Sequence, residues 1–282
     1  MTQPIVDRVV AVTGGARGIG REIAAELAAA GARVAIGDLD GETARATAAR
    51  LPGAVRGFDL DVTDAASFQA FLDAVESLWG PIDVLVCNAG VMWVGPFDAE
   101  PDPATQRMLD VNLHGVIRGV RLAAPAMRSR GHGHIVTVAS AASRLSPPGE
   151  STYAATKHGV LGYLVGVREE LRGSGVQLSV IMPGVVDTEL AVGTATGVAK
   201  LLQPADVARA VVRTVQRPRF EVTIPGYVGP LTRVVGLLPQ RIRDLVLRRM
   251  VPNQVAATRG SSVRAGYEAK ALTESTETGD QP

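Results

Sequence analysis

Short apolar runs rich in β-branched residues recur along the chain and are separated by alanine-rich segments. These runs show no alternation with polar residues, which is typical of strands covered on both faces of a parallel sheet. They predict seven strands, at Val9–Thr13, Val34–Gly37, Val55–Phe58, Val84–Cys87, His134–Ala139, Gln177–Met182 and Phe220–Ile224.

The segments between the strands have the composition and length of helices. They predict helices at Gly20–Ala30, Gly41–Leu51, Ser67–Trp79, Thr105–Arg128, Thr152–Arg172 and Pro204–Val215. Strand–helix alternation of this kind builds a doubly wound, Rossmann-like α/β sheet. We therefore predict one domain over residues 1–228, because neither an internal repeat nor a linker rich in proline or glycine divides it.

The pattern changes after residue 228. Between Leu231 and Met250 apolar residues recur at helical spacing, arginines cluster in the second half, and Pro239 is expected to begin a helix. We predict an amphipathic helical extension over residues 229–257 and a polar, flexible tail over Thr258–Pro282. The favoured interpretation is that the apolar stripe covers a substrate pocket or a neighbouring subunit. The alternative is peripheral contact with an anionic membrane.

Composition narrows the function classes. The 29 basic and 28 acidic side chains nearly cancel, so the overall charge gives no reason to expect a nucleic-acid partner. Cys87 is the only cysteine, which excludes an internal disulfide and suits a reducing compartment. We find neither a signal-peptide pattern nor an apolar run of about 18 residues, and we expect a cytoplasmic protein.

A glycine-rich turn, Thr13–Gly20, joins the first strand to the first helix. Glycine lets a backbone approach a pyrophosphate, and the free N–H groups of a helix start point at the same place. We therefore predict a dinucleotide-phosphate site that includes Gly14, Arg17, Gly18, Ile19 and Gly20. The alternative, a tight turn that binds nothing, explains four glycines less well.

Asp38 ends the second strand, where a carboxylate can accept both hydroxyls of an adenosine ribose and repel a 2′-phosphate. This position favours NAD over NADP. Arg17 favours NADP instead, since a basic side chain in the turn could contact a phosphate. Asp38 could also simply cap the helix that begins near Gly41.

These motifs together resemble the short-chain dehydrogenase/reductase family over residues 5 to 225. The TGxxxGxG turn at Thr13–Gly20 and the YxxxK pair of Tyr153 and Lys157 are the main points of similarity. The resemblance implies a catalytic set of Asn112, Ser140, Tyr153 and Lys157. It also implies cofactor contacts from Tyr153, Lys157 and further residues along the chain, which are Asp61, Val62, Asn88, Ala89, Gly90, Pro183, Gly184, Val186 and Thr188.

Tyr153 and Lys157 lie four positions apart, so on a helix they share one face. A free tyrosine has a pKa of about 10, and a neighbouring ammonium group is expected to lower the pKa of the phenol toward neutrality. Such a tyrosine could donate a proton to a nascent alkoxide or remove one from an alcohol.

Two more side chains belong to the predicted site. Ser140 ends the fifth strand and could orient the substrate oxygen, with Ser143 as its competitor. Asn112 resembles the helix asparagine that in the family holds a water in a relay to the lysine, although an asparagine can also simply bond nearby backbone. The four histidines have no metal-ligand spacing supported by carboxylates, so we expect no catalytic metal.

The substrate side carries apolar residues. Met92, Trp93 and Val94 follow the fourth strand, and Leu145, Pro147 and Pro148 precede Tyr153. If they line the pocket, the substrate is a largely apolar alcohol or ketone, although Trp93 could equally belong to the core or the rim.

The predicted activity is hydride transfer between NAD(H) and a secondary alcohol or ketone. The alternatives are an NAD-dependent epimerase or dehydratase and a non-catalytic nucleotide-sensing scaffold. The resemblance further implies a homodimer or homotetramer that pairs through the two long helices, Thr105–Arg128 and Thr152–Arg172.

Overall fold

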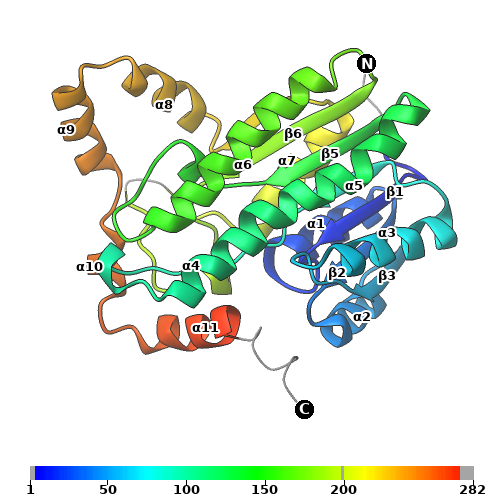
Figure 1. Ribbon diagram of the computed structural model, residues 1–282, viewed down its shortest axis with the longest axis horizontal. Coiled ribbons are helices and arrows are strands. Elements are labelled where there is room, and N and C mark those ends of the chain that lie inside the picture. The colour runs from blue at the N-terminus through cyan, green and yellow to red at the C-terminus, as the bar shows by residue number, and fades with distance from the viewer. Residues whose placement is uncertain (1–3, 198–199, 274–282) are drawn as a thin grey trace.

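A seven-stranded parallel sheet forms the centre of the protein (Figure 1). The computed structural model describes residues 4–197 and 200–273. The spatial order of the strands is β3-β2-β1-β4-β5-β6-β7. Their bounds are β1 Val9–Thr13, β2 Arg33–Asp38, β3 Ala54–Asp59, β4 Val84–Cys87, β5 Gly133–Val138, β6 Val176–Pro183 and β7 Glu221–Ile224. The predicted Rossmann-like fold is confirmed.

Helices cover both faces of the sheet and produce two apolar cores. One face packs against α1 Gly18–Ala29, α2 Gly41–Arg50 and α7 Pro204–Gln216. The other face packs against α3 Ala65–Trp79, α5 Gly115–Arg130 and α6 Ser151–Glu170. Because β1 and β4 are buried along their whole length, their sequences are almost entirely apolar.

The strand order reverses between β1 and β4, and this reversal places the site. In an open parallel sheet, a crevice forms at the carboxyl ends of the strands where the order reverses. The glycine turn after β1 and the loop after β4 meet there, since Gly14 packs against Ala89. Four short helices lie along the same edge: Phe97–Ala99, α4 Asp102–Met108, Ala141–Ser143 and Glu189–Ala191.

The long helix predicted over Thr105–Arg128 is interrupted. Leu109–His114 is a π-helical segment between α4 and α5. Asn112 lies in this segment and is fully buried, with its amide bonded to the backbone of Val91. A π-segment re-aims side chains within a helix and is frequent at functional sites.

The C-terminal region differs most from the sequence expectation. Helices α8 Val228–Gly236 and α9 Gln240–Met250 form the predicted extension, and Pro239 precedes α9 as expected. The flexible tail is wrong for residues 262–273, which form α11 Ser262–Thr273 after the short α10 Gln254–Thr258. Buried contacts of Arg264 and Leu272 hold α11 on the body. Residues 274–282 lie outside the described residues. None of the described helices is long and apolar enough to cross a bilayer.

Candidate active site

The glycine turn is held in shape by close backbone contacts. Gly14 has a φ of +63°, and a Cβ there would lie 2.8 Å from the Cα of Ala89. A Cβ on Gly20 would lie 2.1 Å from the carbonyl oxygen of Gly14, so only glycine lets α1 start this close to the turn. No side chain caps α1, which leaves the N–H groups of its first turn free for an anion.

Asn88, which directly follows β4, holds this turn in place through hydrogen bonds. Its side-chain amide donates to the carbonyl oxygens of Thr13 at 3.1 Å and Gly14 at 2.9 Å. The hydroxyl of Thr13 accepts from the backbone N–H groups of Asn88 and Ala89 in return. The predicted residues Asn88 and Ala89 therefore fix the turn and also line the groove beside it.

Asp38, at the end of β2, faces the turn rather than capping α2. Its carboxylate accepts from the N–H of Ala16 at 3.0 Å and of Asp40 at 3.3 Å. Asp40 is the residue that caps α2, through the N–H of Thr43. Arg17 donates to the carboxylate of Asp40 at 2.6 Å, so this basic side chain is already engaged by an acid.

A groove of about 630 Å³ runs from Asp38 across the carboxyl edge of the sheet. One wall carries predicted cofactor residues, namely Gly14, Arg17, Gly18, Ile19, Asp38, Asp61, Val62, Asn88, Ala89, Gly90 and Thr188. The other wall carries Tyr267, Lys270 and Ala271 of α11. A glycine turn with uncapped helix N–H groups at one end and a carboxylate beyond it fits the pyrophosphate and ribose of a dinucleotide.

Ser140, Tyr153 and Lys157 meet beyond the far end of this groove. Tyr153 and Lys157 lie one turn apart on α6, and the Nζ of Lys157 is 5.4 Å from the centroid of the Tyr153 ring. A hydrogen bond joins the hydroxyls of Ser140 and Tyr153. The competitor Ser143 is buried away from this point, and its hydroxyl has no hydrogen-bond partner among the described residues.

Asn112 lies behind these three residues. Its Oδ1 accepts from the N–H of Val91 at 2.8 Å, and its Nδ2 donates to the carbonyl oxygen of Val91 at 2.8 Å. A Cβ on Gly90 would lie 3.3 Å from Asn112 Oδ1 and 3.6 Å from Lys157 Nζ. The structure thus brings all four residues of the predicted catalytic set to one place.

Burial controls the ionisation of the pair on α6. It raises the pKa of Tyr153 above that of a free phenol, and the Glu150 carboxylate raises it further, while the bond to Ser140 acts in the opposite direction. Burial lowers the pKa of Lys157 to about 8. Burial is the largest influence on the pKa of Tyr153, and it favours the neutral phenol. The lowering of this pKa by Lys157 stays a prediction.

Ser140, Tyr153 and Lys157 open onto a second, apolar cavity of about 220 Å³. Met92, Leu145 and Pro147 line it as expected, and so do Pro183, Gly184, Val186 and Thr188. Trp93 does not: it is half-buried and packs against Gly95 and Met108. Residues of α8 and α9 complete the wall, including Leu231, Val235, Leu247 and Met250. The extension therefore covers this cavity, as the favoured interpretation of the sequence has it.

Comparison with known proteins gives the family. The family model described as short chain dehydrogenase matches residues 8–198. The chain belongs to the short-chain dehydrogenase/reductase family. As a member of this family it is an oxidoreductase that acts on CH–OH groups with a nicotinamide cofactor.

Relatives of this dehydrogenase act on different alcohols. A 3-alpha-(or 20-beta)-hydroxysteroid dehydrogenase of Mycobacterium tuberculosis is 34% identical over 217 residues, which cover 75% of this chain and 84% of the relative. A D-threitol dehydrogenase of Mycolicibacterium smegmatis is 41% identical over 186 residues, 65% of this chain and 72% of the relative. The crystal structure of a short-chain dehydrogenase/reductase from Burkholderia phymatum in complex with NAD has a TM-score of 0.76 at 27% identity, covering 88% of this chain and 97% of that one.

Glu150 is a charged member of the dehydrogenase site that the sequence analysis missed. It directly precedes α6, is nearly buried, and lines the apolar cavity with Tyr153. Burial raises the pKa of Glu150 to about 7, and Arg264 acts in the opposite direction. A carboxyl in this position can change its charge near neutral pH.

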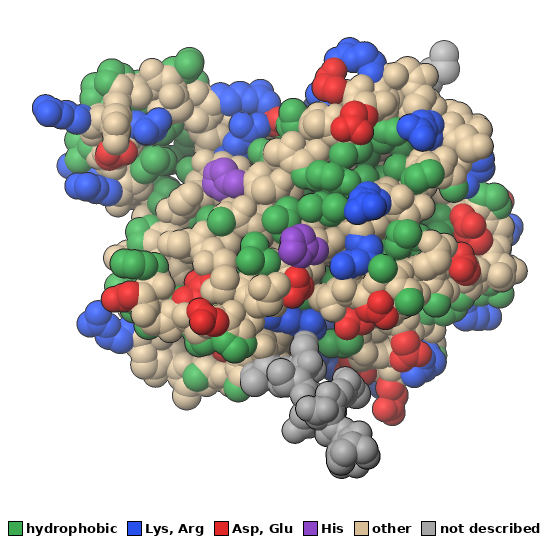
Figure 2. All heavy atoms as spheres, in the orientation of Figure 1, with side chains coloured by type: hydrophobic (Ala, Val, Ile, Leu, Met, Phe, Trp, Pro, Cys, Tyr) green, Lys and Arg blue, Asp and Glu red, His purple; other side chains and the backbone are tan. Residues whose placement is uncertain are grey.

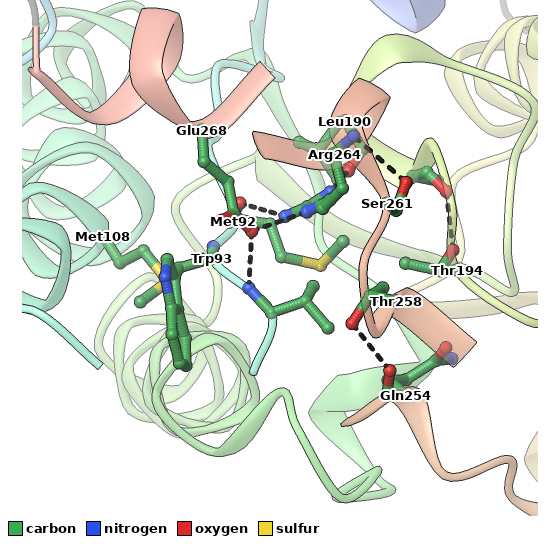
Figure 3. Close-up of polar contacts among 12 residues, drawn as sticks. Met92, Trp93, Met108, Leu190, Thr194, Gln254, Thr258, Ser261, Arg264 and Glu268 are labelled. Carbon is green, nitrogen blue, oxygen red and sulfur yellow. Dashed lines mark hydrogen bonds and ion pairs between the residues drawn. The ribbon is translucent and has the colours of Figure 1, made fainter. Parts of the chain in front are cut away.

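Arg264 of α11 ties together the two loops that flank the site (Figure 3). Its guanidinium donates to the carbonyl oxygens of Met92, after β4, and Leu190, after β6. Its Nε donates to Glu268 at 2.6 Å, and Glu268 accepts from the N–H of Val94 at 3.0 Å. We call these contacts the α11 clasp. The i, i+4 spacing of Arg264 and Glu268 was the only local signal of this helix.

The described residues form no candidate metal site. Among residues 4–197 and 200–273, no group of three or more His, Cys, Asp or Glu side chains is placed to hold a metal ion. His134 is buried and bonded to Ser179 at 2.8 Å, whereas His132 lies exposed just after α5.

Proposed function

We propose that this protein transfers hydride between NAD(H) and a secondary alcohol or ketone with a largely apolar body. One observation carries the proposal. The groove and the apolar cavity share Ile19, Asn88, Gly90, Thr188 and Leu190 as lining residues, so the two spaces adjoin. A dinucleotide along the groove would therefore reach the cavity that contains Ser140 and Tyr153.

Tyr153 supplies the proton in this mechanism. Bound nicotinamide supplies a hydride to the substrate carbon in one direction and accepts it in the other. Tyr153 stays protonated at neutral pH because the pKa of its phenol is raised. In ketone reduction the phenol therefore donates its proton to the substrate oxygen. In the reverse direction the same oxygen takes the proton back. Ser140 holds the substrate oxygen beside the phenol, since its hydroxyl already meets that of Tyr153.

Lys157 and Asn112 support this step from behind. A charged Lys157 stabilises negative charge that forms on the tyrosine oxygen, and it can donate to the ribose of the cofactor. Asn112 is a positioning residue, because its oxygen accepts from Val91 and its nitrogen donates to Val91 and to Thr156. It fixes the loop at Gly90 and Val91 against the cofactor groove.

The preference for NAD rests on Asp38 and Asp40. Asp38 lies in the groove wall at the end of β2, where a 2′-phosphate would meet its negative charge. Asp40 engages Arg17, the one basic side chain of the glycine turn. The negative charge of Asp38 and the pairing of Arg17 with Asp40 therefore both disfavour NADP.

A substrate screen that follows NADH absorbance at matched NADH and NADPH concentrations tests the proposal. We expect turnover with ketones that carry apolar bodies, and a higher kcat/KM with NADH than with NADPH. Tyr153→Phe serves as the control for background reduction. If the protein binds NADH but turns over no carbonyl or alcohol in a broad panel, the scaffold alternative replaces this proposal.

A further inference from the structure

Helices α8 and α9 form a hairpin that projects from the body at the side of the apolar cavity (Figure 1). One face of this hairpin is already explained. Leu231 and Val235 of α8 and Leu247 and Met250 of α9 line the cavity. The opposite face has no described protein partner, and it is the subject of this inference.

The outer face of the hairpin exposes large apolar side chains. Leu237 at its tip is 86% exposed, and Val234 is 59% exposed on α8. Ile242 and Leu245 of α9 are 51% and 55% exposed. At helical spacing, Leu245 lies opposite Leu247 and Met250, and Ile242 lies opposite Leu247. Such a cluster marks a surface that another apolar phase covers.

Basic side chains surround these apolar ones (Figure 2). The segment from Tyr227 to Met250 contains five arginines and one acid, Asp244, whereas the whole chain carries a net charge of only +1. Arg233 is paired with Glu221 at 3.0 Å. The other four, which are Arg241, Arg243, Arg248 and Arg249, form no ion pair with any described carboxylate.

We propose that the outer face of the α8–α9 hairpin docks on an anionic lipid surface. Leu237, Ile242 and Leu245 enter the boundary between headgroups and acyl chains, and the exposed Arg241, Arg248 and Arg249 of α9 contact lipid phosphates. A second copy of the chain is the less suited occupant, because two copies of this face would bring together two surfaces that both carry excess positive charge. A nucleic acid would match the charge but would leave the apolar side chains exposed.

The docked orientation has a consequence that rests on the proposed function. In this orientation the hairpin lies between the lipid, which contacts its outer face, and the substrate cavity, which its inner face lines. An apolar ketone dissolved in the bilayer would then reach Ser140 and Tyr153 without crossing bulk water. The lipid-docking proposal itself needs no catalysis, so the two can fail separately.

Vesicle co-sedimentation of the full chain tests docking directly. Phosphatidylcholine vesicles with and without phosphatidylglycerol serve as the probe, and no substrate is present. We expect binding that requires phosphatidylglycerol and weakens as salt rises. Equal binding to both vesicles, or binding to neither, overturns the proposal.

Two pairs of variants locate the contact. Arg248→Gln/Arg249→Gln should weaken binding to anionic vesicles about 30-fold, which corresponds to about 1 kcal/mol for each arginine near such a surface. Arg50→Gln/Arg128→Gln, exposed arginines on α2 and α5, is the matched control. Leu237→Asp should also abolish binding, whereas Leu78→Asp, an exposed leucine on α3, should not. NADH binding checks that each variant is folded. Equal effects of test and control variants overturn the assignment to this face.

A kinetic measurement separates delivery from docking. With an apolar ketone presented in anionic vesicles, Leu237→Asp should raise KM and leave kcat unchanged. With a short water-soluble ketone, both constants should stay as in the native protein. If Leu237→Asp still binds vesicles, the docking proposal is contradicted. If it loses vesicle binding but keeps the native KM for the vesicle-borne ketone, the delivery of substrate from the bilayer is contradicted.

Discussion

The guanidinium of Arg17 is paired with the carboxylate of Asp40 at 2.6 Å, immediately beyond the end of β2. The hydroxyl of Thr43 accepts from the same guanidinium at 3.2 Å. This arrangement turns a basic residue of the glycine turn toward α2. The side chain that would otherwise attract a 2′-phosphate is therefore already engaged.

Asp40→Asn should raise the affinity for NADPH several-fold and leave NADH affinity nearly unchanged. The asparagine oxygen can still cap α2 through Thr43, but the charge that holds Arg17 is gone. Fluorescence titration with both reduced cofactors measures the change. Adding Arg17→Gln should cancel the gain, and a gain that persists in the double variant would show that Arg17 is not its source.

Tyr153→Phe should lower kcat by about 10²- to 10⁴-fold, the usual contribution of a general acid. The substitution removes a hydroxyl but little packing, so the NADH dissociation constant should stay within about twofold. Lys157→Ala should damage both turnover and NADH binding. Steady-state kinetics and titration together check these outcomes. Substantial turnover by Tyr153→Phe would falsify the proposed role.

Glu150→Gln should move the pH profile of ketone reduction toward lower pH. The charged Glu150 raises the pKa of Tyr153, so its loss lowers that pKa. Reduction needs protonated Tyr153, and its rate therefore falls at a lower pH in the variant. In the native protein the pKa of Glu150 is about 7, so Glu150 is charged throughout the alkaline range in which Tyr153 loses its proton, and the two profiles should separate there. Alkaline limbs that coincide in the native protein and the variant would contradict this coupling.

Arg264→Met should destabilise the protein by about 1–3 kcal/mol, because the carbonyl oxygens of Met92 and Leu190 lose their donor and the partly exposed Glu268 loses its charged partner. The loops at Met92 and Leu190 lose their common donor, so NADH should also dissociate faster. Urea unfolding and stopped-flow release of NADH measure the two effects. Arg259→Met replaces an exposed arginine between α10 and α11 and should change neither quantity.

The exposed face of α6 predicts how copies of the chain associate. A Cβ at Gly162 or Gly166 would meet no protein atom within 4 Å, and Val165 between them is 46% exposed. We expect a homodimer or homotetramer that uses this face. Gly162→Arg/Gly166→Arg should shift sedimentation at micromolar concentration toward the monomer. A native protein that sediments only as a monomer contradicts the expectation.

The sequence predicts the centre of the sheet well because strands such as β1 and β4 are buried on both faces. Val9–Thr13 and Val84–Cys87 have the same bounds in sequence and structure. The site residues were also predictable where a local motif carries them, as for the glycine turn and the pair on α6. In each case the chemistry depends on neighbours within one turn of chain.

Other features depend on contacts that no local pattern records. The π-segment at Asn112 is stabilised by Val91, a residue of another loop. Glu150 has its raised pKa only because the fold buries it. Helix α11 is anchored in large part by Arg264, a residue type that a sequence pattern assigns to solvent.

The α11 clasp also bears on the order in which the molecule folds. Its bond from Arg264 to Met92 joins residues 172 positions apart in the chain. Closing so long a loop costs entropy that only other contacts can offset, so contacts of this kind form late. The sheet and the glycine turn rest on nearer pairings, such as Val10 with Val34. The cofactor groove should therefore exist first with one wall, and gain its second wall only when α11 docks.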